Sequence, residues 1–449
     1  MKLSINRFLA GNARSIKAKK NVLASTIIRG ADAIIYIFIV PLTLGYLNPY
    51  EYGVWLTLNS ILVWINSFDI GLGNGLRNKL SVALAENNIE KARLYVSTTF
   101  FVLISIISFV YLIGLFFIYQ IDWYSLLNVR EGTIDNLPDI VSVSFLFFCA
   151  NFVLKTTGNV YQALQLPALN NLITFLGNFI SLVVIFILTI ISETGSLFWV
   201  AFAYSAAPTV VYLIAYPITF KKYYRYLEPS IRFCSKNSLK DLMSLSVVFF
   251  VLQIAGVVLF GLSNVLISKL FGPDQVTPYN IAYRYFSFIP MLFVIIITPV
   301  WSAVTEAYVN KDFSWIGRCN KAIQKMLLIS GFVALLMVLL SDMVYKVWVG
   351  DKVVIPIELS AVMAIYIFIY IWSLSFSYFL NGLGRLRIQM YCTLLAALCF
   401  YPVCSYLGER YGLLGVTMGM CIINLPGAVL NTIQFNKVMN NTDRGIWGK

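Results

Sequence analysis

Long runs of apolar residues, separated by short polar segments, follow one another along almost the whole chain. A helix that crosses the hydrocarbon core of a bilayer needs about 20 residues. Twelve runs approach or exceed that length, at residues 21–47, 52–69, 96–119, 140–159, 170–191, 197–220, 242–270, 279–301, 323–341, 357–380, 388–407 and 411–435. Since a bilayer offers no partners to backbone polar groups, each run is predicted to be helical. The pattern predicts an all-α integral membrane protein with about twelve transmembrane helices.

The composition excludes a soluble protein of two or three domains. Hydrophobic residues make up 59% and charged residues 12% of the 449 residues, whereas soluble chains have about 45–50% and 25%. The loops between the runs are too short for a large extramembrane domain. Seven cysteines without a Cys-x-x-Cys pair, and no histidine, argue against a disulfide framework and a zinc site. No metal and no cofactor are therefore expected.

The distribution of basic residues predicts the orientation in the membrane. With the N-terminus in the cytoplasm, 26 of the 33 Lys and Arg residues fall in cytoplasmic segments and four in periplasmic loops. This asymmetry follows the positive-inside rule and places both termini in the cytoplasm. The net charge of +13 then reflects topology and contact with anionic lipids, not nucleic-acid binding. The basic start lacks the apolar core of a signal peptide, so it is expected to be retained.

The two halves of the chain carry similar segments. Pro49 and Pro273 lie 224 residues apart in matching turns, and Arg93 and Arg318 lie 225 apart in matching basic loops. A six-helix half enters and leaves on one side, so two such halves are expected to form pseudo-symmetric lobes around a central cavity. The predicted organisation is a cytoplasmic basic lead-in at 1–20, an N-terminal six-helix lobe at 21–220, a cytoplasmic basic linker at 221–241, a C-terminal six-helix lobe at 242–436 and a cytoplasmic tail at 437–449.

Several turn motifs then resemble a known family. They are Leu47-x-Pro49-x-x-Tyr52-Gly53 between the first two runs, Asp69-Ile-Gly71-Leu-Gly73 after the second, and Tyr161-Gln162-Ala163-Leu164-Gln165 after the fourth. The stretch Pro41–Leu80 resembles the opening of bacterial polysaccharide transporters of the O-antigen flippase type, in the multidrug/oligosaccharidyl-lipid/polysaccharide exporter superfamily. The resemblance extends over essentially the whole chain through the twelve-span, two-lobe plan. The motifs are structural turns, so they specify the family better than the substrate.

The resemblance implies a transporter and not an enzyme. Its expected cargo is an undecaprenyl-diphosphate-linked oligosaccharide (an O-antigen, capsule or exopolysaccharide repeat unit), moved across the bacterial inner membrane by alternating access. Expected partners are this lipid-linked glycan, membrane lipids, a coupling ion (Na⁺ or H⁺) and other polysaccharide assembly proteins. The Gly-rich segment at 71–75 has the spacing G-x-G-x-G after a membrane helix, which favours a tight turn over a phosphate-binding loop.

Arg29 and Asp32 stand three residues apart within the first apolar run. An ionisable side chain inside a membrane is costly and usually faces a cavity or a partner. One interpretation is that the two residues neutralise each other. The other is that Arg29 binds the diphosphate of the cargo, with Asp32 orienting it, because a guanidinium fork matches phosphate oxygens in a bidentate manner. The sequence leaves both interpretations open.

Arg284 and Lys155 are further candidates for binding substrate. Arg284 follows Tyr283 and precedes Tyr285 and Phe286, so it either reaches the membrane interface or lies in the cavity beside rings that stack on sugars. Lys155, near the cytoplasmic end of the fourth run, either meets the diphosphate on entry or simply follows the positive-inside rule. The predicted substrate-binding residues are thus Arg29, Asp32, Lys155 and Arg284.

Two other functions compete with the flippase. An ion-coupled multidrug exporter of the same superfamily would favour acidic residues in the cavity, yet the apolar runs hold three basic residues (Arg29, Lys269 and Arg284) and one acidic residue (Asp32). This balance favours an anionic cargo. A membrane-embedded polysaccharide polymerase or glycosyltransferase would need catalytic acids on a sizeable loop. The longest predicted periplasmic loop, 120–139, is too short to make that the better interpretation.

Overall fold

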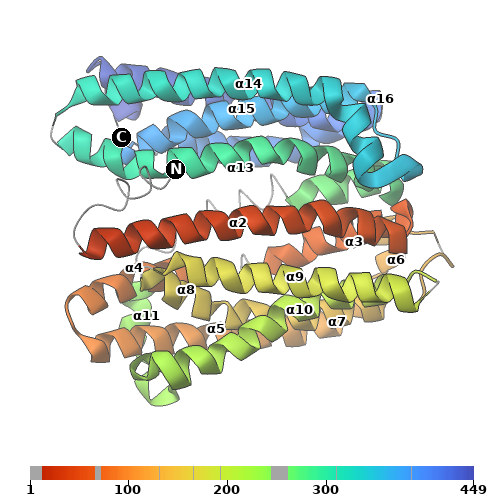
Figure 1. The fold of residues 1–449 in the computed structure, drawn as a ribbon, viewed down its shortest axis with the longest axis horizontal. Coiled ribbons are helices and arrows are strands. Elements are labelled where there is room, and N and C mark those ends of the chain that lie inside the picture. The colour runs from red at the N-terminus through yellow and green to blue at the C-terminus, as the bar shows by residue number, and fades with distance from the viewer. Residues whose placement is uncertain are drawn as a thin grey trace. The chain divides into compact units, whose positions relative to one another are not determined.

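The structure is a computed structural model that describes residues 13–65, 72–130, 132–164, 166–192, 194–243, 261–309, 311–385 and 387–448. Nearly all of these residues are helical, and no strand occurs within these ranges. The chain divides into two compact units, residues 1–253 and 254–449. The all-α class predicted from the apolar runs is confirmed (Figure 1).

The N-terminal unit is a bundle of long helices with short connecting helices. In Figure 1, α2, α9, α10 and α7 run lengthwise in this unit, and α2 packs closely along α9. The helices are α2 (Ala13–Tyr46), α3 (Pro49–Leu62), α4 (Leu72–Ala85), α5 (Ile89–Ile118), α6 (Trp123–Leu127), α7 (Leu137–Leu154), α8 (Thr156–Ala163), α9 (Pro167–Ile191), α10 (Leu197–Pro217) and α11 (Lys236–Met243).

The C-terminal unit has fewer and longer helices in its described part. They are a helix at Gly261–Phe271, then α13 (Pro273–Val309), α14 (Phe313–Val349), α15 (Ile357–Gly382) and α16 (Arg387–Met439). α15 packs against α13, α14 and α16. α16 contains two helices that meet at Gly412, whose φ of 63° and ψ of −148° are not helical. The two last apolar runs of the sequence are therefore separate helices, joined by a kink at Gly412.

Helix starts repeat between the two units. Pro49 opens α3 behind the capping residue Asn48, and Pro273 opens α13. Asn48 accepts a hydrogen bond from the backbone N–H of Glu51 at 2.9 Å, which satisfies one of the free donors of the first turn. α5 begins at Ile89 and α14 at Phe313. Both pairs of starts are 224 residues apart, as the internal repeat predicts.

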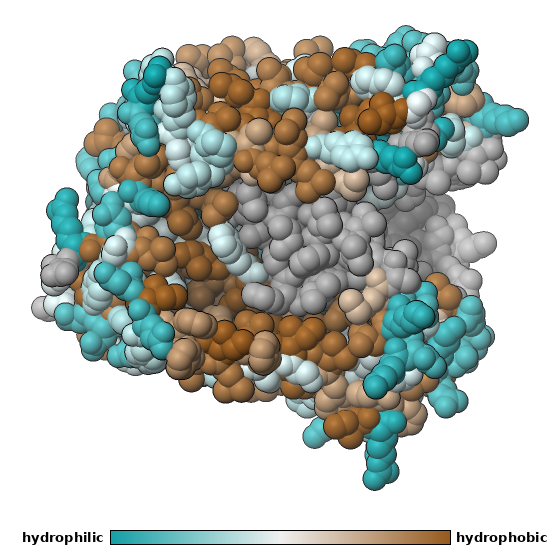
Figure 2. Space-filling view, turned by 180° about the vertical axis from the view of Figure 1, so that it is seen from behind, coloured by the Kyte–Doolittle hydropathy of each residue, from teal (hydrophilic) through white to brown (hydrophobic). Residues whose placement is uncertain are grey.

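The helices carry the apolar surface that a bilayer requires. Among the described residues, nine helices are long and apolar enough to cross a membrane. Large apolar side chains point outward, as Leu112 and Phe116 of α5 do with 66% and 64% of their surface exposed. Figure 2 shows apolar side chains over the middle of the helices and polar ones toward the helix ends. The second and seventh predicted runs lie partly outside the described residues, so the count of twelve stays a prediction.

Three local features differ from the sequence-based expectations. α2 begins at Ala13, so part of the predicted lead-in is already helical. Leu72–Gly75 form the first turn of α4, so the tight turn predicted at 71–75 is wrong for these residues, and Gly71 lies outside the described part. Gly73 and Gly75 therefore lie within the helix α4 and not in a turn. The fourth run is divided at Lys155 into α7 and α8.

The segment at 221–241, predicted as the linker, packs against α4 and α5 of the N-terminal unit. The guanidinium of Arg93 donates to the carbonyl oxygen of Glu228 at 3.1 Å and lies over the ring of Phe233. Asp241 on α11 forms a salt bridge with Lys79 and accepts a hydrogen bond from the Tyr95 hydroxyl. This segment is therefore a docked part of the N-terminal unit.

The predicted orientation can be tested at four exposed positions outside the apolar runs. Cysteines introduced at Asn128 and Asp351 are expected to react with an impermeant thiol reagent added to spheroplasts, whereas cysteines at Lys236 and Arg387 are expected to react only after lysis. The background needs Cys234→Ser, because this native cysteine is exposed in the same linker as Lys236. The reverse labelling pattern would contradict the cytoplasmic location of both termini.

Candidate functional site

Arg29 and Asp32 lie about one turn apart on α2 but do not pair with each other. The salt bridges within 4.0 Å in the described part of the chain join Lys79 to Asp241, Lys346 to Asp342, and Arg385 to Asp443. The carboxylate of Asp32 accepts instead a hydrogen bond from Nδ2 of Asn178 on α9, at 2.7 Å. The side chain of Arg29 is exposed. The structure thus lacks the ion pair between Arg29 and Asp32, which was one of the two interpretations that the sequence left open.

The bond between Asp32 and Asn178 belongs to a polar ladder between α2 and α9. Two turns earlier on both helices, the amide of Asn171 donates to the hydroxyl of Ser25. Both bonds join residues 146 positions apart, so the two helices run in the same direction, as predicted for the first and fifth spans. Side-chain hydrogen bonds between helices stabilise a pair inside a membrane where water offers no alternative partner. This ladder fixes the register of α2 on α9.

Lys155 stands at the junction of α7 and α8. Its backbone N–H donates to the carbonyl oxygen of Asn151 at 2.8 Å, and its own carbonyl accepts from Gly158 at 2.9 Å, so the chain stays helical through the junction. The side chain is exposed. α8 packs on α4 and α9, which places Lys155 at a junction between packed helices of the N-terminal unit.

Arg284 lies on α13, partly buried between aromatic neighbours. Tyr285 makes an edge contact with Tyr345 of α14 at 5.3 Å between ring centroids, and Phe286 is buried. Tyr283 is partly exposed and stacks on Tyr279. Of the aromatic neighbours of Arg284, Tyr285 and Phe286 are therefore buried, and Tyr285 is covered by α14. Tyr283 alone of the three keeps partial exposure.

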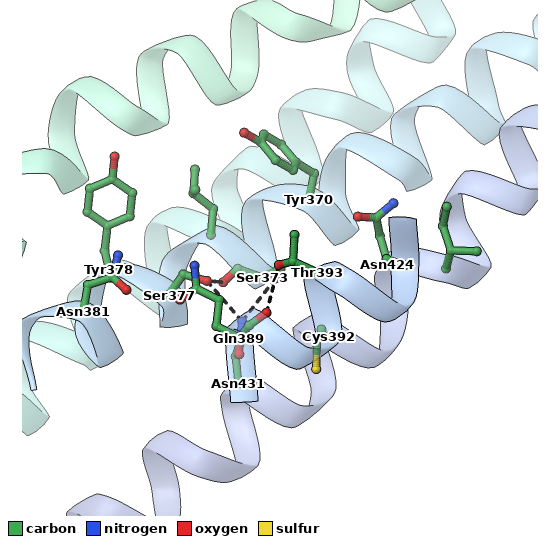
Figure 3. Close-up of a pocket in the computed structure, with 14 residues that line it drawn as sticks. Tyr370, Ser373, Ser377, Tyr378, Asn381, Gln389, Cys392, Thr393, Asn424 and Asn431 are labelled. Carbon is green, nitrogen blue, oxygen red and sulfur yellow. Dashed lines mark hydrogen bonds between the residues drawn. The ribbon is translucent and has the colours of Figure 1, made fainter. Parts of the chain in front are cut away.

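A cavity of about 200 Å³ lies in the C-terminal unit between α15 and α16. Its polar lining consists of neutral side chains. Figure 3 shows them converging from both helices: Tyr370, Ser373, Ser377, Tyr378, Asn381, Gln389, Thr393, Asn424 and Asn431. None of the four predicted substrate-binding residues lines this cavity.

The sequence does contain a signal for this cavity. Ser373, Ser377 and Asn381 follow one another at intervals of four within an apolar run, which places them on one face of α15. Asn424 and Asn431 are seven residues apart on α16 and share a face in the same way. These side chains are neutral, so a charge within an apolar run does not mark them.

A second cavity, of about 350 Å³, lies in the N-terminal unit near the loop before α7. Its lining includes the carboxyl side chains of Glu51, Asp135 and Asp139. Within the described residues, no group of three His, Cys, Asp or Glu side chains is arranged to hold a metal ion. The negative charge of this cavity is unsuited to a diphosphate.

These features define a class of protein. Long apolar helices cover the described chain, their surface is apolar where lipid would meet it, and polar groups gather inside each unit. The protein is a multi-pass membrane protein of the transporter type. It belongs to the polysaccharide biosynthesis protein family, whose model matches residues 18–303. A second family model, MatE, matches residues 241–406.

Curated relatives extend over most of the chain at low identity. A Salmonella typhi protein provisionally named an O-antigen transporter is 22% identical over 91% of this chain and 92% of its own length. A Yersinia pseudotuberculosis protein provisionally named an O-antigen export protein is 22% identical over 86% of this chain and 88% of its own. These relatives are named for transport. With the family match and the apolar helices, they support a membrane transporter.

Solved structures share the fold. A multidrug resistance MATE family transporter of the MOP superfamily, in an inward-facing conformation, aligns with a TM-score of 0.74 and 14% identity, over 93% of this chain and 98% of that one. A MOP superfamily transporter from Pyrococcus furiosus aligns with a TM-score of 0.65 and 15% identity, over 98% of both chains. The fold is therefore that of MOP superfamily transporters.

The polar ladder predicts an energetic coupling between Asp32 and Asn178. In a double-mutant cycle with Asp32→Ala and Asn178→Ala, we expect a coupling of about 0.6 kcal/mol in the free energy of unfolding, the typical value for interhelical hydrogen bonds in membranes. Steric trapping in lipid bicelles measures this quantity. Thr189→Val is the matched control, because the Thr189 hydroxyl donates to the carbonyl oxygen of Phe186 on its own helix, at 2.7 Å. A coupling of zero would contradict the ladder.

Proposed function

We propose that the protein is a flippase for undecaprenyl-diphosphate-linked oligosaccharide, an O-antigen, capsule or exopolysaccharide repeat unit. It moves the cargo from the inner to the outer leaflet of the bacterial inner membrane by alternating access. Its further partners are membrane lipids, a coupling ion (Na⁺ or H⁺) and other polysaccharide assembly proteins. The family match and the names of the two relatives support this cargo class.

The observation that carries the proposal is the exposure of the Arg29 side chain together with its lack of a salt bridge in the described residues. Its side chain is exposed on the candidate membrane span Leu23–Tyr46 of α2, and none of the salt bridges in the described residues includes it. A guanidinium at membrane depth is costly without a counter-charge or water. A diphosphate supplies two negative groups whose oxygens match the guanidinium fork. Arg29 is therefore the proposed ligand of the diphosphate.

Asp32 has a different role in the proposal from the one that the sequence suggested. Its carboxylate is held by Asn178 of α9 and not by Arg29. Asp32 is therefore proposed to hold α2 on α9 through the hydrogen bond that its carboxylate accepts from the Asn178 amide. Lys155 and Arg284 remain proposed substrate contacts, as exposed and partly buried cations respectively.

An ion-coupled multidrug exporter is the second candidate. The MatE model matches residues 241–406, and a similar solved structure is described as a multidrug resistance transporter. An exporter of cationic drugs would be favoured by carboxylates in its binding site. The cavity of the C-terminal unit is instead lined by neutral side chains. A deletion strain with normal surface glycan and increased drug sensitivity would favour the exporter.

Deletion of the gene tests the cargo. We expect lipid-linked repeat units to accumulate on the cytoplasmic leaflet while their synthesis continues, because a transporter acts after synthesis. The accessibility of the units to a membrane-impermeant glycosidase, in spheroplasts and in inverted vesicles, reports the leaflet. Loss of the lipid-linked units altogether, or their accumulation on the outer leaflet, would favour synthesis or polymerisation.

Substitution of Arg29 tests its role in binding. Arg29→Ala is expected to abolish transport, measured as surface glycan at matched protein levels, because the charge-assisted fork is lost. Arg29→Lys is expected to restore only part, since an ammonium keeps the charge but not the bidentate geometry.

The double variant Arg29→Ala with Asp32→Ala separates binding from neutralisation. Because Asn178 already holds Asp32, we expect this variant to stay inactive. Lys346→Ala, which removes an exposed cation paired with Asp342, is the control and should transport normally. A fully active double variant would show that Arg29 serves only to neutralise Asp32.

A further inference from the structure

Three side-chain amide oxygens that line the cavity of the C-terminal unit lack hydrogen-bond partners. They are Oδ1 of Asn381, Oε1 of Gln389 and Oδ1 of Asn431, and each is buried without a partner in the part of the chain that the structure describes. A buried polar atom is nearly always satisfied in a folded protein, by protein groups, water or a ligand. Three acceptors of the same kind in one cavity indicate a ligand that supplies hydrogen-bond donors.

Asn431 is oriented firmly by its neighbours. Its side chain is 1% exposed, and its Nδ2 donates to the hydroxyl oxygens of Ser373 at 3.3 Å and Ser377 at 3.1 Å. The Ser377 hydroxyl already donates to the carbonyl oxygen of Ser373 at 2.9 Å, so it accepts from Nδ2 of Asn431 and leaves the amide oxygen available for another donor (Figure 3). The unsatisfied oxygen is therefore a consequence of the packing and not of a freely rotating amide.

The chemistry of the lining limits the class of ligand. Gln389 and Thr393 from the start of α16 and Asn381 from the end of α15 add neutral polar groups, while Tyr370 and Tyr378 add aromatic rings. The lining carries no Asp, Glu, Lys or Arg side chain. Neutral amides, hydroxyls and rings suit an uncharged ligand that has many hydroxyl groups and a partly apolar face.

The size of the cavity limits the ligand further. A volume of about 200 Å³ is far larger than one water or a bare monovalent cation needs, since a cavity of about 10–15 Å³ on the same measure already holds a water. A six-membered sugar ring with its hydroxyl groups is of the required size. Its hydroxyls and any N-acetyl N–H donate hydrogen bonds, and the C–H groups of its ring face pack on aromatic side chains.

We propose that this cavity binds one uncharged sugar residue of the transported glycan. The sugar donates hydrogen bonds to Asn381, Gln389 and Asn431 and packs against Tyr370 or Tyr378. This inference rests on the proposed function and assigns to the C-terminal unit the recognition of glycan, separately from the diphosphate contact proposed for Arg29. The three amides set which sugars are accepted, because a sugar without matching donors leaves the oxygens unsatisfied.

Leucine substitutions distinguish binding from structure. In Gln389→Leu and Asn381→Leu, an unsatisfied amide is replaced by an alkyl group of similar shape, so the Tm of the purified protein should stay the same or rise. Surface glycan at matched protein levels should fall at least tenfold. Asn280→Leu is the control in the same unit, because its amide is already bonded to Asn264 at 2.7 Å and to the carbonyl of Val276 at 2.9 Å. This control should lower the Tm.

Direct binding is measured by saturation-transfer NMR on the purified full-length protein, with methyl glycosides of N-acetylglucosamine, galactose and rhamnose as probes. At least one probe should give a signal that both leucine variants lose and Asn280→Leu keeps. Normal transport by both leucine variants, or loss of transport only together with a lower Tm, would overturn the proposal. A sodium site in this cavity would also overturn it. In that case no probe binds, and NaCl raises the Tm of the wild-type protein but not of the leucine variants, while choline chloride has no effect on either.

The outcome for the flippase function is separate. If the wild-type gene fails to restore surface glycan in the deletion strain, the proposed function is wrong whatever the probes do. If the wild-type gene restores glycan but the leucine variants do so equally well, the function stands and the sugar site is wrong.

Discussion

The hydrogen bond between Asn178 and Asp32 shows the constraint on which the rest of the structure depends. In hydrocarbon, a polar group has to find its partner within the protein, because neither lipid nor water replaces a missing one. α2 and α9 meet this requirement with two bonds in the same register, and buried hydroxyls meet it within their own helices, as Thr57 does with the carbonyl of Gly53 at 2.9 Å. The unit is held by van der Waals packing, and these bonds select one register among the many that apolar surfaces would allow.

Outside the apolar runs, contacts between charged and polar side chains hold the segments together. Asp241 of α11 bonds to Lys79 of α4 and to Tyr95 of α5, and these contacts, Lys79 first, hold the pKa of the Asp241 carboxyl below its usual range. Backbone N–H groups of Ser230 and Ser235 donate to hydroxyls of Ser97 and Thr98 on α5, both at 3.1 Å. The basic segment after α10 is thus held to the N-terminal unit by these contacts.

Much of the fold could be predicted from apolar runs because lipid imposes length and composition on every spanning helix. Pro49 and Pro273 marked equivalent helix starts correctly, since proline lacks the N–H that a first turn leaves unused. The helical course of Leu72–Gly75 could not be predicted in the same way, because glycine tolerates both a turn and a helix and tertiary packing decides. The partner of Asp32 was also out of reach. Arg29 was the nearest charge in sequence, whereas Asn178 is the nearest donor in space.

The candidate sites differ in how they depart from the rule that buried polar groups are satisfied. Arg29 is a charge exposed on an apolar helix, and Asn381, Gln389 and Asn431 present buried oxygens without donors in the described structure. An unsatisfied buried acceptor costs about 1–3 kcal/mol, and a ligand that donates hydrogen bonds to these oxygens would remove that cost. A charged diphosphate and a neutral sugar have different desolvation costs, and each requires its own kind of partner. A guanidinium and neutral amides are these two kinds of partner, and the proposed cargo carries both chemistries in one molecule.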